Sequence, residues 1–465
     1  MNYISTRGEA PKLGFEDVLL AGLARDGGLY LPESWPQISP ETIRSFAAKP
    51  FAEIAVEVIH PFTGGAISRD ALRRMADDAY GTFGNPSVTP LVELTPGHYI
   101  LELFHGPTLA FKDVAMQLLA RLMDHVLEKR GQRAMIVGAT SGDTGGAAIE
   151  AFRSSSRVDV VILFPDGRVS DVQRRMMTTP RDANVHAVAI GGTFDDCQAL
   201  VKAMFNDHAF RDRVQLSGVN SINWARIVAQ ITYYFYAAAQ LGAPDKAVSF
   251  SVPTGNFGDI FAGYAARRMG LGIDRLIIAS NENDILPRTV ASGVYEMRGV
   301  KATSSPSMDI QISSNFERYL FEASDRDPAR IRNLMQSLTN SKRFELGDLW
   351  PVLKSDFSAV AATEQDVSDC IKLTHKKHGY LLDPHTACGF VATQRLKPTG
   401  EIVTLATAHP AKFPDAMEAI TGTRPVLPAR LANLMSDPER FEVLAANLKS
   451  IQSYVEGVAG GRGKA

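Results

Sequence analysis

The sequence predicts an α/β fold in which largely parallel sheets are covered by helices. Short apolar runs rich in β-branched residues recur along the chain, and most are followed by a turn and a helical pattern. Continuous apolar runs are typical of parallel strands that are buried on both faces. Strands that alternate with helices indicate the same class. With 465 residues, 45% hydrophobic and 22% charged, the chain is long enough for several domains and a large core.

The predicted strands lie mainly in the middle of the chain. Four of them lead directly into a turn and a helical pattern, which favours a parallel sheet. The predicted strands are residues 134–140, 158–164, 185–192, 247–254, 274–281 and 401–407.

Helical patterns dominate three further regions. Residues 41–80 and roughly 325–380 are charged on one face, and residues 425–455 carry apolar side chains at helical spacing. The Ser, Pro and Asn content of residues 302–316 predicts a long loop, and loops of that length are often functional. The last residues, 460–465, are expected to form a disordered tail.

Charge and composition exclude several classes of function. The net charge of -2 creates no long-range field of one sign, so no nucleic-acid partner is expected. Residues 160–164 form the longest compact apolar run, which is too short to span a membrane. The N-terminus has no signal-peptide pattern, which favours a cytoplasmic protein. The three cysteines have no ligand spacing, so we expect reduced thiols and no metal: Cys197, Cys370 and Cys388.

Residues 139–152, ATSGDTGGAAIEAF, are predicted to form a glycine-rich turn between a strand and a helix. The N-terminus of a helix offers free N–H groups and a partial positive charge, which favour an anion. Ser141 and Thr144 add hydroxyl donors. The stretch lacks the full dinucleotide, P-loop and hydrolase-elbow patterns. Taken alone, it fits an anion site or a well-capped tight turn equally.

A second glycine turn and one lysine carry a stronger signal. Residues 255–258, Gly-Asn-Phe-Gly, follow strand 247–254 at the end where open α/β sheets bind ligands, although a plain tight turn remains the alternative. Lys112 is predicted in the first turn of a helix, where cations are disfavoured. Burial there lowers the pKa of a lysine and yields the neutral amine that imine formation needs. A solvated surface charge is the alternative for a lone lysine.

Together these motifs resemble the fold type II pyridoxal-phosphate enzymes and, more narrowly, the threonine synthase family. The resemblance rests on Lys112 within FKD, on Ser-Gly-Asp-Thr-Gly at 141–145, on the turn at 255–258 and on Thr407 within TAHPAKF. It runs from the first residue to about residue 425. Three further segments match that family: residues 5–33, 221–230 and 313–322.

The resemblance implies a cofactor site. Lys112 would carry pyridoxal 5'-phosphate as a Schiff base and act as the catalytic residue. Thr407 would hydrogen-bond the pyridine nitrogen of the cofactor. Asp143 stands where most relatives in the wider superfamily have asparagine, so its contact with the cofactor is left open. Four residues would bind the cofactor phosphate: Gly255, Asn256, Phe257 and Gly258.

The resemblance also implies the reaction. O-phospho-L-homoserine would lose phosphate from its γ carbon and gain water at its β carbon, which gives L-threonine. Arginine is a preferred partner for phosphate, so Arg226 is favoured as the substrate cation over a solvated helix charge. For Asn315 and Arg318 the alternative is a helix cap with an ordinary surface arginine. Six residues are expected to bind the substrate: Ser141, Thr144, Asn220, Arg226, Asn315 and Arg318.

Two other functions fit the same motifs. A phospho-lyase with the same Lys112 would convert the same substrate to 2-oxobutyrate, ammonia and phosphate. A non-catalytic binding or signalling protein is disfavoured by the intact lysine and by both glycine turns. His105 and His409 lie beside the matched motifs, where packing or hydrogen bonding is favoured over base catalysis.

The family resemblance implies two α/β domains with the cofactor between them. Residues 1–95 form an N-terminal region, and residues 96–240 a smaller domain with the lysine helix and the first glycine turn. Residues 241–425 form a larger domain with the cofactor-phosphate turn, and residues 426–465 a helical region and tail. The expected assembly is a monomer or a homodimer.

Overall fold

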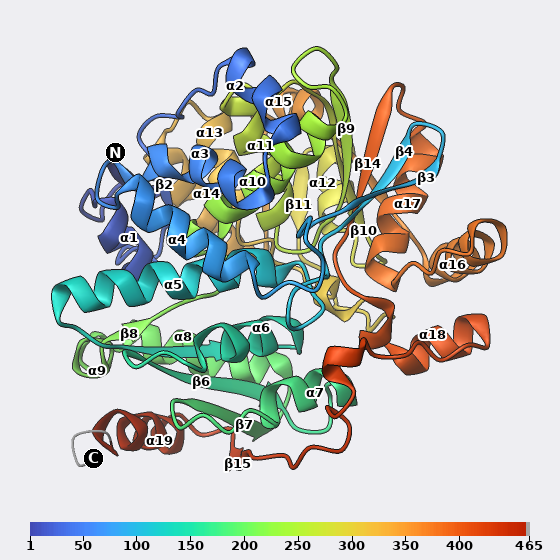
Figure 1. The fold of residues 1–465 in the computed structure, drawn as a ribbon. Helices are drawn as coiled ribbons and strands as arrows, with labels where there is room; N and C mark the ends of the chain where they lie inside the picture. The colour runs from blue at the N-terminus through green and yellow to red at the C-terminus, as the bar shows by residue number, and fades with distance from the viewer. Residues whose placement is uncertain (462–465) are drawn as a thin grey trace.

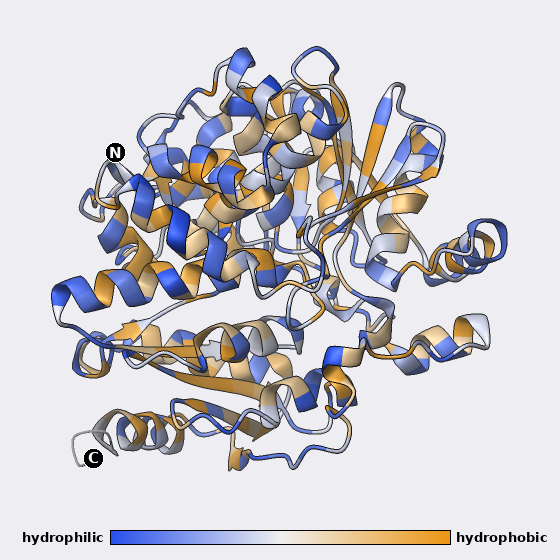
Figure 2. Ribbon diagram, viewed as in Figure 1, coloured by the Kyte–Doolittle hydropathy of each residue, from blue (hydrophilic) through white to orange (hydrophobic). Residues whose placement is uncertain are grey.

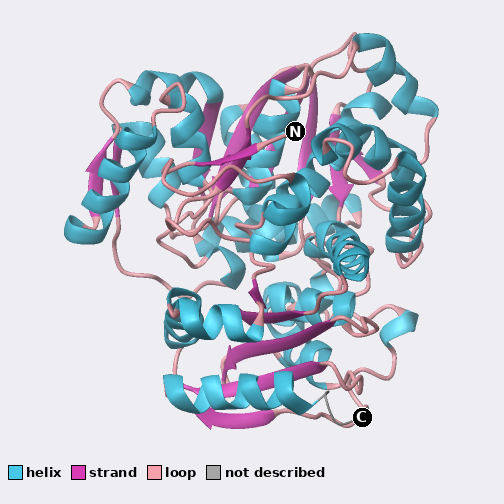
Figure 3. Ribbon diagram, turned by 90° about the vertical axis from the view of Figure 1, so that its left-hand side faces the viewer, coloured by secondary structure: helices cyan, strands magenta, loops and turns pink. Residues whose placement is uncertain are grey.

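Two mainly parallel sheets form the frame of the molecule, which the computed structural model describes for residues 1–461 (Figure 1). Within this part of the chain the larger sheet has six strands and the smaller sheet has five. Helices cover both sheets, and Figure 3 shows the smaller sheet below the larger one with helices on either side. The predicted α/β class is therefore confirmed.

The larger sheet has the strand order β13-β10-β9-β14-β4-β3, and only the edge pair β3 and β4 is antiparallel. β14 pairs in parallel with both β9 and β4, so β9 and β14 lie side by side and end at the same edge of the sheet. The second glycine turn and Thr407 follow these two strands. The strands are β3 (Leu91–Thr95), β4 (His98–Glu102), β9 (Val248–Pro253), β10 (Ile273–Ser280), β13 (Phe357–Ala361) and β14 (Glu401–Ala406).

The smaller sheet is entirely parallel, in the order β15-β7-β6-β5-β8. Strand β5 lies inside this sheet, and its carboxyl end leads into the first glycine turn. Two antiparallel pairs lie outside the two sheets, β1 (Tyr3–Ser5) with β2 (Tyr30–Pro32) and β11 (Val294–Glu296) with β12 (Arg343–Glu345). The strands of the smaller sheet are β5 (Ala134–Ala139), β6 (Val158–Pro165), β7 (Val185–Gly191), β8 (Leu216–Ser217) and β15 (Glu442–Ala445).

Each sheet is packed on both faces, and apolar residues concentrate at those contacts (Figure 2). On the smaller sheet, α6 (Asp143–Phe152) and α7 (Asp171–Thr178) cover one face, and three helices cover the other: α8 (Phe194–Asn206), α9 (His208–Val214) and α19 (Leu448–Gly461). On the larger sheet, one face packs against α10 (Trp224–Gln240) and α11 (Gly258–Arg268), and the other packs against α16 (Glu364–His378), α17 (Pro384–Leu396) and α18 (Pro414–Thr421).

The remaining helices are α1 (Phe15–Ala21), α2 (Pro40–Ser45), α3 (Phe51–Thr63), α4 (Arg69–Tyr80), α5 (Lys112–Arg130), α12 (Ile285–Ser292), α13 (Phe316–Ala323), α14 (Pro328–Ser341) and α15 (Leu349–Asp356).

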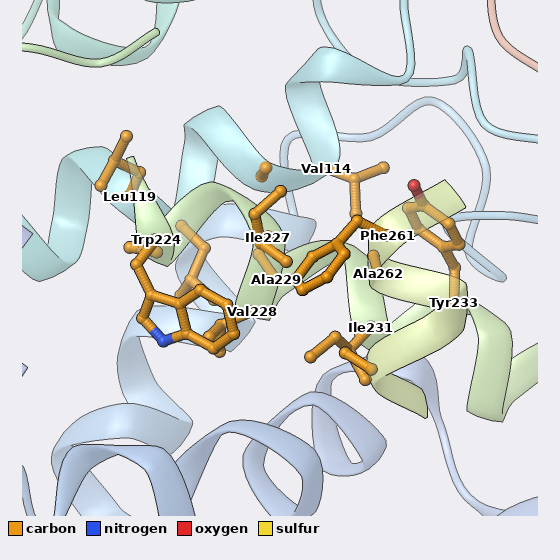
Figure 4. Close-up of a cluster of buried hydrophobic side chains, with 14 of the residues drawn as sticks. Val114, Leu119, Trp224, Ile227, Val228, Ala229, Ile231, Tyr233, Phe261 and Ala262 are labelled. Carbon is orange, nitrogen blue, oxygen red and sulfur yellow. The ribbon is translucent and has the colours of Figure 1, made fainter. Parts of the chain in front are cut away.

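The lysine helix α5 lies between the two sheets (Figure 1). Its apolar residues contact α6 of the smaller sheet and also α10, which packs against the larger sheet. Figure 4 shows Val114 and Leu119 of α5 beside Ile227 of α10, with Phe261 of α11 in the same cluster. One continuous core therefore supports Lys112 from both sides.

The C-terminal region differs from the sequence prediction. Residues 425–455 were expected to be helical, but α19 begins only at Leu448, and the preceding chain forms the short turn η4 (Ala429–Leu431) and strand β15. The apolar spacing reflects packing of a largely extended chain, because Leu434 is buried against Val172 and β15 completes the smaller sheet. Of the predicted tail, residues 460 and 461 belong to α19, and residues 462–465 lie outside the described residues.

The other predicted regions are mostly confirmed. Residues 41–80 are mainly helical, and residues 302–315 form a loop that contains the short turn η2 (Pro306–Met308), while Phe316 already begins α13. Within 325–380 the structure adds strands β12 and β13 to the predicted helices. Strand β4 joins the larger sheet, although the expected boundary at residue 96 groups it with the smaller domain. In the described part of the chain, no helix is both long and apolar enough to cross a membrane.

Candidate active site

Lys112 is the first residue of α5 and lies beside the end of β14. The backbone N–H of Phe111 donates to the carbonyl oxygen of Thr407 at 2.8 Å. Ala110 and Ala408 form an isolated antiparallel bridge next to that contact. The chain that leads into the lysine helix is therefore fixed to the segment after β14, and this brings Lys112 close to Thr407.

The amine of Lys112 is buried, with only 8% of the residue exposed. Its Nζ lies 3.3 Å from Oδ2 of Asp143 and 4.7 Å from the centre of the Phe111 ring. Burial lowers the pKa of Lys112 below its ordinary value; the carboxylate of Asp143 opposes this effect, while Lys412 and Arg226 add to it. The site thus favours loss of the proton that a nucleophilic lysine must lose.

Asp143 is the charged centre of the first glycine turn. It is the first residue of α6, and its Oδ1 lies 2.7 Å from Nζ of Lys412 and accepts from Nε2 of Gln173 at 2.8 Å. Its Oδ2 accepts from Nζ of Lys112 at 3.3 Å and from the hydroxyl of Ser307 at 3.2 Å. Burial opposes ionisation, but the ammonium groups of Lys412 and Lys112 outweigh it and hold the pKa of Asp143 well below its ordinary value. Asp143 is therefore an anion with four donors around it.

The first glycine turn satisfies part of its own backbone. The hydroxyl of Thr140 accepts from the backbone N–H of Gly142 and of Gly145, each at 2.9 Å. Gly142 has φ +141°, and a Cβ there would lie 2.5 Å from the side chain of Gln173, so this position requires glycine. Ser141 and Thr144 are half-buried on this turn. Their proposed contact with the substrate stays a prediction.

The second glycine turn is tightly enclosed by the loop 302–316. A Cβ on Gly255 would lie 3.1 Å from the carbonyl oxygen of Ser307 and 3.2 Å from Cα of Met308. The side chain of Asn256 accepts from the backbone N–H of Gly258 at 3.0 Å. Phe257 is fully buried at φ +65°, a conformation that is strained for a bulky residue and is found mainly at functional sites. The turn has the shape expected of a close backbone cradle.

Arg226 is a buried cation in the first turn of α10. It is 2% exposed, its Nη1 donates to the carbonyl oxygen of Val219 at 3.3 Å, and its Nε has no hydrogen-bond partner in the described chain. Burial lowers the pKa of Arg226 to about 10, so it remains charged at neutral pH. A buried charge without an ionic partner is costly, which favours an anionic ligand at this position. Asn220 is half-buried in the loop before α10.

Asn315 and Arg318 lie next to the second turn, and both side chains donate hydrogen bonds to other residues of the chain. The backbone N–H of Asn315 donates to the carbonyl oxygen of Asn256 at 3.0 Å, and its side-chain amide donates to the backbone carbonyl oxygen of Ser221 at 3.2 Å. Arg318 is fully buried and donates to Asn315 and to two backbone carbonyl groups, of Tyr30 and Ile222. These contacts fix the loops around the turn, and direct substrate contact by either residue stays a prediction.

Thr407 is held by a second polar network. Its backbone N–H donates to the hydroxyl of Thr386 at 3.3 Å, and Thr386 donates to Asp383, the cap of α17. Asp383 also pairs with Nδ1 of His385 at 2.9 Å. The backbone N–H of Ser307 approaches Nε2 of His385 at 3.4 Å. The network therefore joins Thr407 to the loop that covers the second turn.

The two histidines beside the motifs have structural contacts. Nε2 of His105 lies 2.8 Å from Oε2 of Glu102. Nδ1 of His409 accepts from the backbone N–H of Ala411 at 3.1 Å, and burial lowers the pKa of His409 to about 4. Hydrogen bonding, as the sequence favoured, accounts for both. The described residues contain no group of three or more histidine, cysteine or acidic side chains that could hold a metal ion.

Several residues of the site were not identified from the sequence. Lys412 lies inside the quoted motif TAHPAKF, so its position beside Thr407 was available as a signal. The others come from separate segments and meet only through the tertiary fold, so no local pattern indicates them. They are Thr108, Gln173, Ser307, Asp383 and His385.

Models of known families match almost the whole chain. The family described as "Pyridoxal-phosphate dependent enzyme" matches residues 84–408, which include Lys112 and both glycine turns. With the fold and the buried lysine, this match defines the chain as a fold type II pyridoxal-phosphate dependent enzyme. The family described as "Threonine synthase N terminus" matches residues 2–80, and that described as "Threonine synthase, C-terminal" matches residues 386–455.

Individual relatives match this chain over their full length or nearly so. The threonine synthase of Pseudomonas aeruginosa is 50% identical over 468 residues, covering 100% of both chains. The crystal structure of pyridoxal-phosphate-bound threonine synthase from Brucella melitensis is 60% identical, with a TM-score of 0.96 over 99% of this chain and 100% of that chain. Yeast threonine synthase is 39% identical, with a TM-score of 0.92 over 99% of each chain. The chain belongs to the threonine synthase family.

Proposed function

We propose that this chain converts O-phospho-L-homoserine and water into L-threonine and phosphate, with pyridoxal 5'-phosphate as cofactor. The observation that carries the proposal is a buried amine, Lys112, near a buried cation, Arg226, which forms no salt bridge with the described residues and whose Nε has no hydrogen-bond partner among them. The amine suits covalent attachment of an aldehyde cofactor. The arginine suits the phosphate of a substrate. Family membership supports the same reaction.

The residues fit the cofactor. A Cβ on Gly255 would be crowded by its neighbours. Because glycine has no Cβ, the backbone of the second turn can approach a phosphate closely. Thr407 follows β14 at the same edge of the sheet and would face the ring nitrogen. Lys112 would provide the covalent link. Four residues would hold the cofactor phosphate: Gly255, Asn256, Phe257 and Gly258.

When bound, the cofactor supplies a ring that accepts electrons from bonds broken at the α carbon of the substrate. The chain supplies the acid and base groups and the orientation. Besides holding the cofactor, Lys112 would take the α proton of the substrate at Nζ. Its lowered pKa favours the free amine that this step requires.

The substrate phosphate would be held by the groups around the first turn. Opposite unit charges about 4 Å apart attract by about 4 kcal/mol at an effective dielectric near 20, so one buried arginine contributes substantially. Arg226 would provide that charge, and neighbouring polar groups would complete the site. The proposed substrate ligands remain Ser141, Thr144, Asn220 and Arg226, with Asn315 and Arg318 as the less favoured pair.

The phospho-lyase reaction is the second candidate, since it uses the same lysine and the same substrate. The named relatives favour the synthase over the lyase. Three further properties stay predictions: a cytoplasmic location, a monomeric or homodimeric state and the lack of a nucleic-acid partner. Sedimentation of the purified chain would decide the oligomeric state.

Product analysis tests the proposal. The purified chain, supplied with pyridoxal 5'-phosphate and O-phospho-L-homoserine, should release L-threonine and phosphate in equal amounts. A Lys112→Ala variant of the same chain should release neither. Phosphate accompanied by 2-oxobutyrate and ammonia would contradict the synthase reaction and support the phospho-lyase.

A further inference from the structure

The carboxylate of Asp143 lies between two lysine ammonium groups. Nζ of Lys412 lies 2.7 Å from Oδ1 of Asp143, and Nζ of Lys112 lies 3.3 Å from Oδ2. The shorter contact is with Lys412, the lysine without an assigned role. All three side chains are buried, so water screens their interactions weakly.

Lys412 is held in this position by the fold. It is 1% exposed, ends the short turn η3 (Pro410–Lys412) after β14, and donates to the carbonyl oxygen of Thr108 at 2.7 Å. Asp143 begins α6 on the smaller sheet. The pair therefore connects the segment after β14 to the smaller sheet. A buried ion pair seldom adds net stability, so a position in contact with Lys112 favours a functional reason for it.

The charges explain what the pair would do. An isolated carboxylate beside Lys112 would favour the ammonium form of that lysine, because an opposite charge nearby stabilises the charged state. With Lys412 present, the negative charge of Asp143 already has a positive partner. Lys112 can then lose its proton and leave the group of three electrically neutral.

We propose that Lys412 is a positioning residue whose ammonium group compensates the Asp143 carboxylate, so that the neighbouring Lys112 amine can give up its proton. The inference rests on the proposed function, because it assigns the neutral amine to Lys112. Asp143 and Lys412 together form an electrically neutral pair beside Lys112.

Other charged groups also face Lys112 and remain in place in every variant below. Arg226 approaches from α10 and adds to the lowering of the Lys112 pKa, whereas Asp259 approaches from α11 and interacts with Lys112 in the opposite sense. Asp113 lies next to Lys112 on α5. Since these groups are constant, a difference between variants reports on Asp143 and Lys412.

The test measures the protonation of Lys112 without relying on activity. The full-length chain, stripped of cofactor, is labelled with a trace of acetic anhydride between pH 6 and pH 11, and acetylation of the Lys112 peptide is quantified by mass spectrometry. In Lys412→Met the midpoint of this profile should rise by about one to three pH units, the usual effect of an opposite charge. Acetylation at neutral pH should fall by about tenfold per unit of that rise.

Two further variants determine the cause. Asp143→Asn should move the Lys112 midpoint in the opposite direction, and the double variant Asp143→Asn with Lys412→Met should return close to the unmodified chain. Lys129→Met, which removes an exposed ion pair with Glu16, is the matched control and should change nothing. An unchanged midpoint in Lys412→Met, or a double variant that behaves like Lys412→Met alone, would overturn the proposal.

The outcome is separable from the proposed function and from misfolding. Circular dichroism establishes which variants fold, and Asp143→Asn tests the sign of the effect even if Lys412→Met does not fold. An upward or absent shift in folded Asp143→Asn would refute the inference. If the midpoints shift as expected but no threonine forms from O-phospho-L-homoserine, the inference holds and the proposed function fails.

Discussion

The two glycine turns look alike in sequence but differ in electrostatics. Each follows the carboxyl end of a parallel strand, β5 or β9, and each opens a helix that has an aspartate in its first turn. The aspartates are Asp143 in the first turn and Asp259 in the second. Their surroundings determine which turn can accept a phosphate.

Asp143 is ionised. Lys412 and Lys112 hold its pKa well below the ordinary value despite burial, and Thr140 occupies two backbone N–H groups of the same turn. The first turn therefore carries a negative charge, and it can accept a substrate anion only with help from a cation such as Arg226. Its glycine-rich sequence therefore suggests more free N–H donors than the turn has.

Among the described residues, the hydrogen-bond donors to the side chain of Asp259 are two hydroxyl groups. The hydroxyl groups of Tyr233 and Tyr234 donate to its Oδ1 at 2.5 and 3.0 Å, and burial raises the pKa of Asp259 to about 7. A carboxyl group that is often protonated at neutral pH does not repel a nearby phosphate strongly. The second turn thus suits the cofactor phosphate, and the comparison teaches that partners of the aspartate matter more than the glycine pattern.

Among the variants that test this comparison, Arg226→Leu should have the largest effect, because it removes the cation that we assign to the substrate phosphate. Loss of the buried cation should weaken substrate binding by about 2–3 kcal/mol, or roughly thirty- to two-hundredfold in KM, while cofactor affinity stays the same. Steady-state kinetics and a cofactor titration measure the two quantities. Loss of cofactor with unchanged KM would assign Arg226 to the other phosphate and break the comparison.

Gly255→Ala should weaken cofactor binding. The new Cβ would lie about 3.1 Å from the carbonyl oxygen of Ser307, and overpacking of this kind costs about 1–3 kcal/mol. Absorbance titration with pyridoxal 5'-phosphate gives the change in Kd. Gly272→Ala is the matched control, because a Cβ there meets nothing within 4 Å. Equal cofactor affinities in the two variants would argue against the second turn as the cradle.

Thr140→Val should lower stability rather than cofactor affinity. It leaves the backbone N–H groups of Gly142 and Gly145 without their acceptor, which costs about 1–2 kcal/mol in the free energy of unfolding. Urea unfolding measures the change, and Thr140→Ser, which keeps the hydroxyl, should stay near the original value. A loss of cofactor affinity as large as that of Gly255→Ala would contradict the comparison.

Asp259→Asn should produce the smallest effect, visible only in pH dependence. Because burial raises the pKa of Asp259 to about 7, its charge appears as pH rises through that value and should then weaken phosphate binding. Between pH 6 and pH 8.5, Kd for pyridoxal 5'-phosphate should rise by roughly three- to tenfold in the unmodified chain, but not in Asp259→Asn. Asp369→Asn, an exposed carboxylate on α16, should keep the original profile. Identical profiles in the unmodified chain, Asp259→Asn and Asp369→Asn would show that the charge of Asp259 does not affect cofactor binding.

Much of the fold follows from local patterns. The strands with continuous apolar runs, such as 134–140 and 247–254, are found close to their expected bounds because both faces are buried. Strands β3 and β13 lie at the edges of the larger sheet and β15 at the edge of the smaller one; each is short, and none was predicted. Their sequences carry weaker patterns, since pairing to a distant strand, rather than local composition, determines their structure.

The candidate site, like the fold, was only partly predictable from local sequence patterns. Lys112, Thr407 and the turn at 255–258 lie in recognisable motifs, and the structure brings Lys112 and Thr407 together through a backbone hydrogen bond. The charge of Asp143 could not be predicted, because its partners Lys412 and Ser307 come from segments far along the chain. Electrostatic environment depends on three-dimensional contacts that a linear pattern does not contain.

Borohydride reduction tests the central claim most directly. The full-length chain is loaded with pyridoxal 5'-phosphate, reduced and digested, and the modified peptide is identified by mass spectrometry. The account predicts one cofactor per chain, attached at Lys112, and no attachment in Lys112→Ala. Lys412, a second buried lysine beside Asp143, serves as the internal comparison and should remain unmodified. Attachment at Lys412, or none at Lys112, would contradict the account.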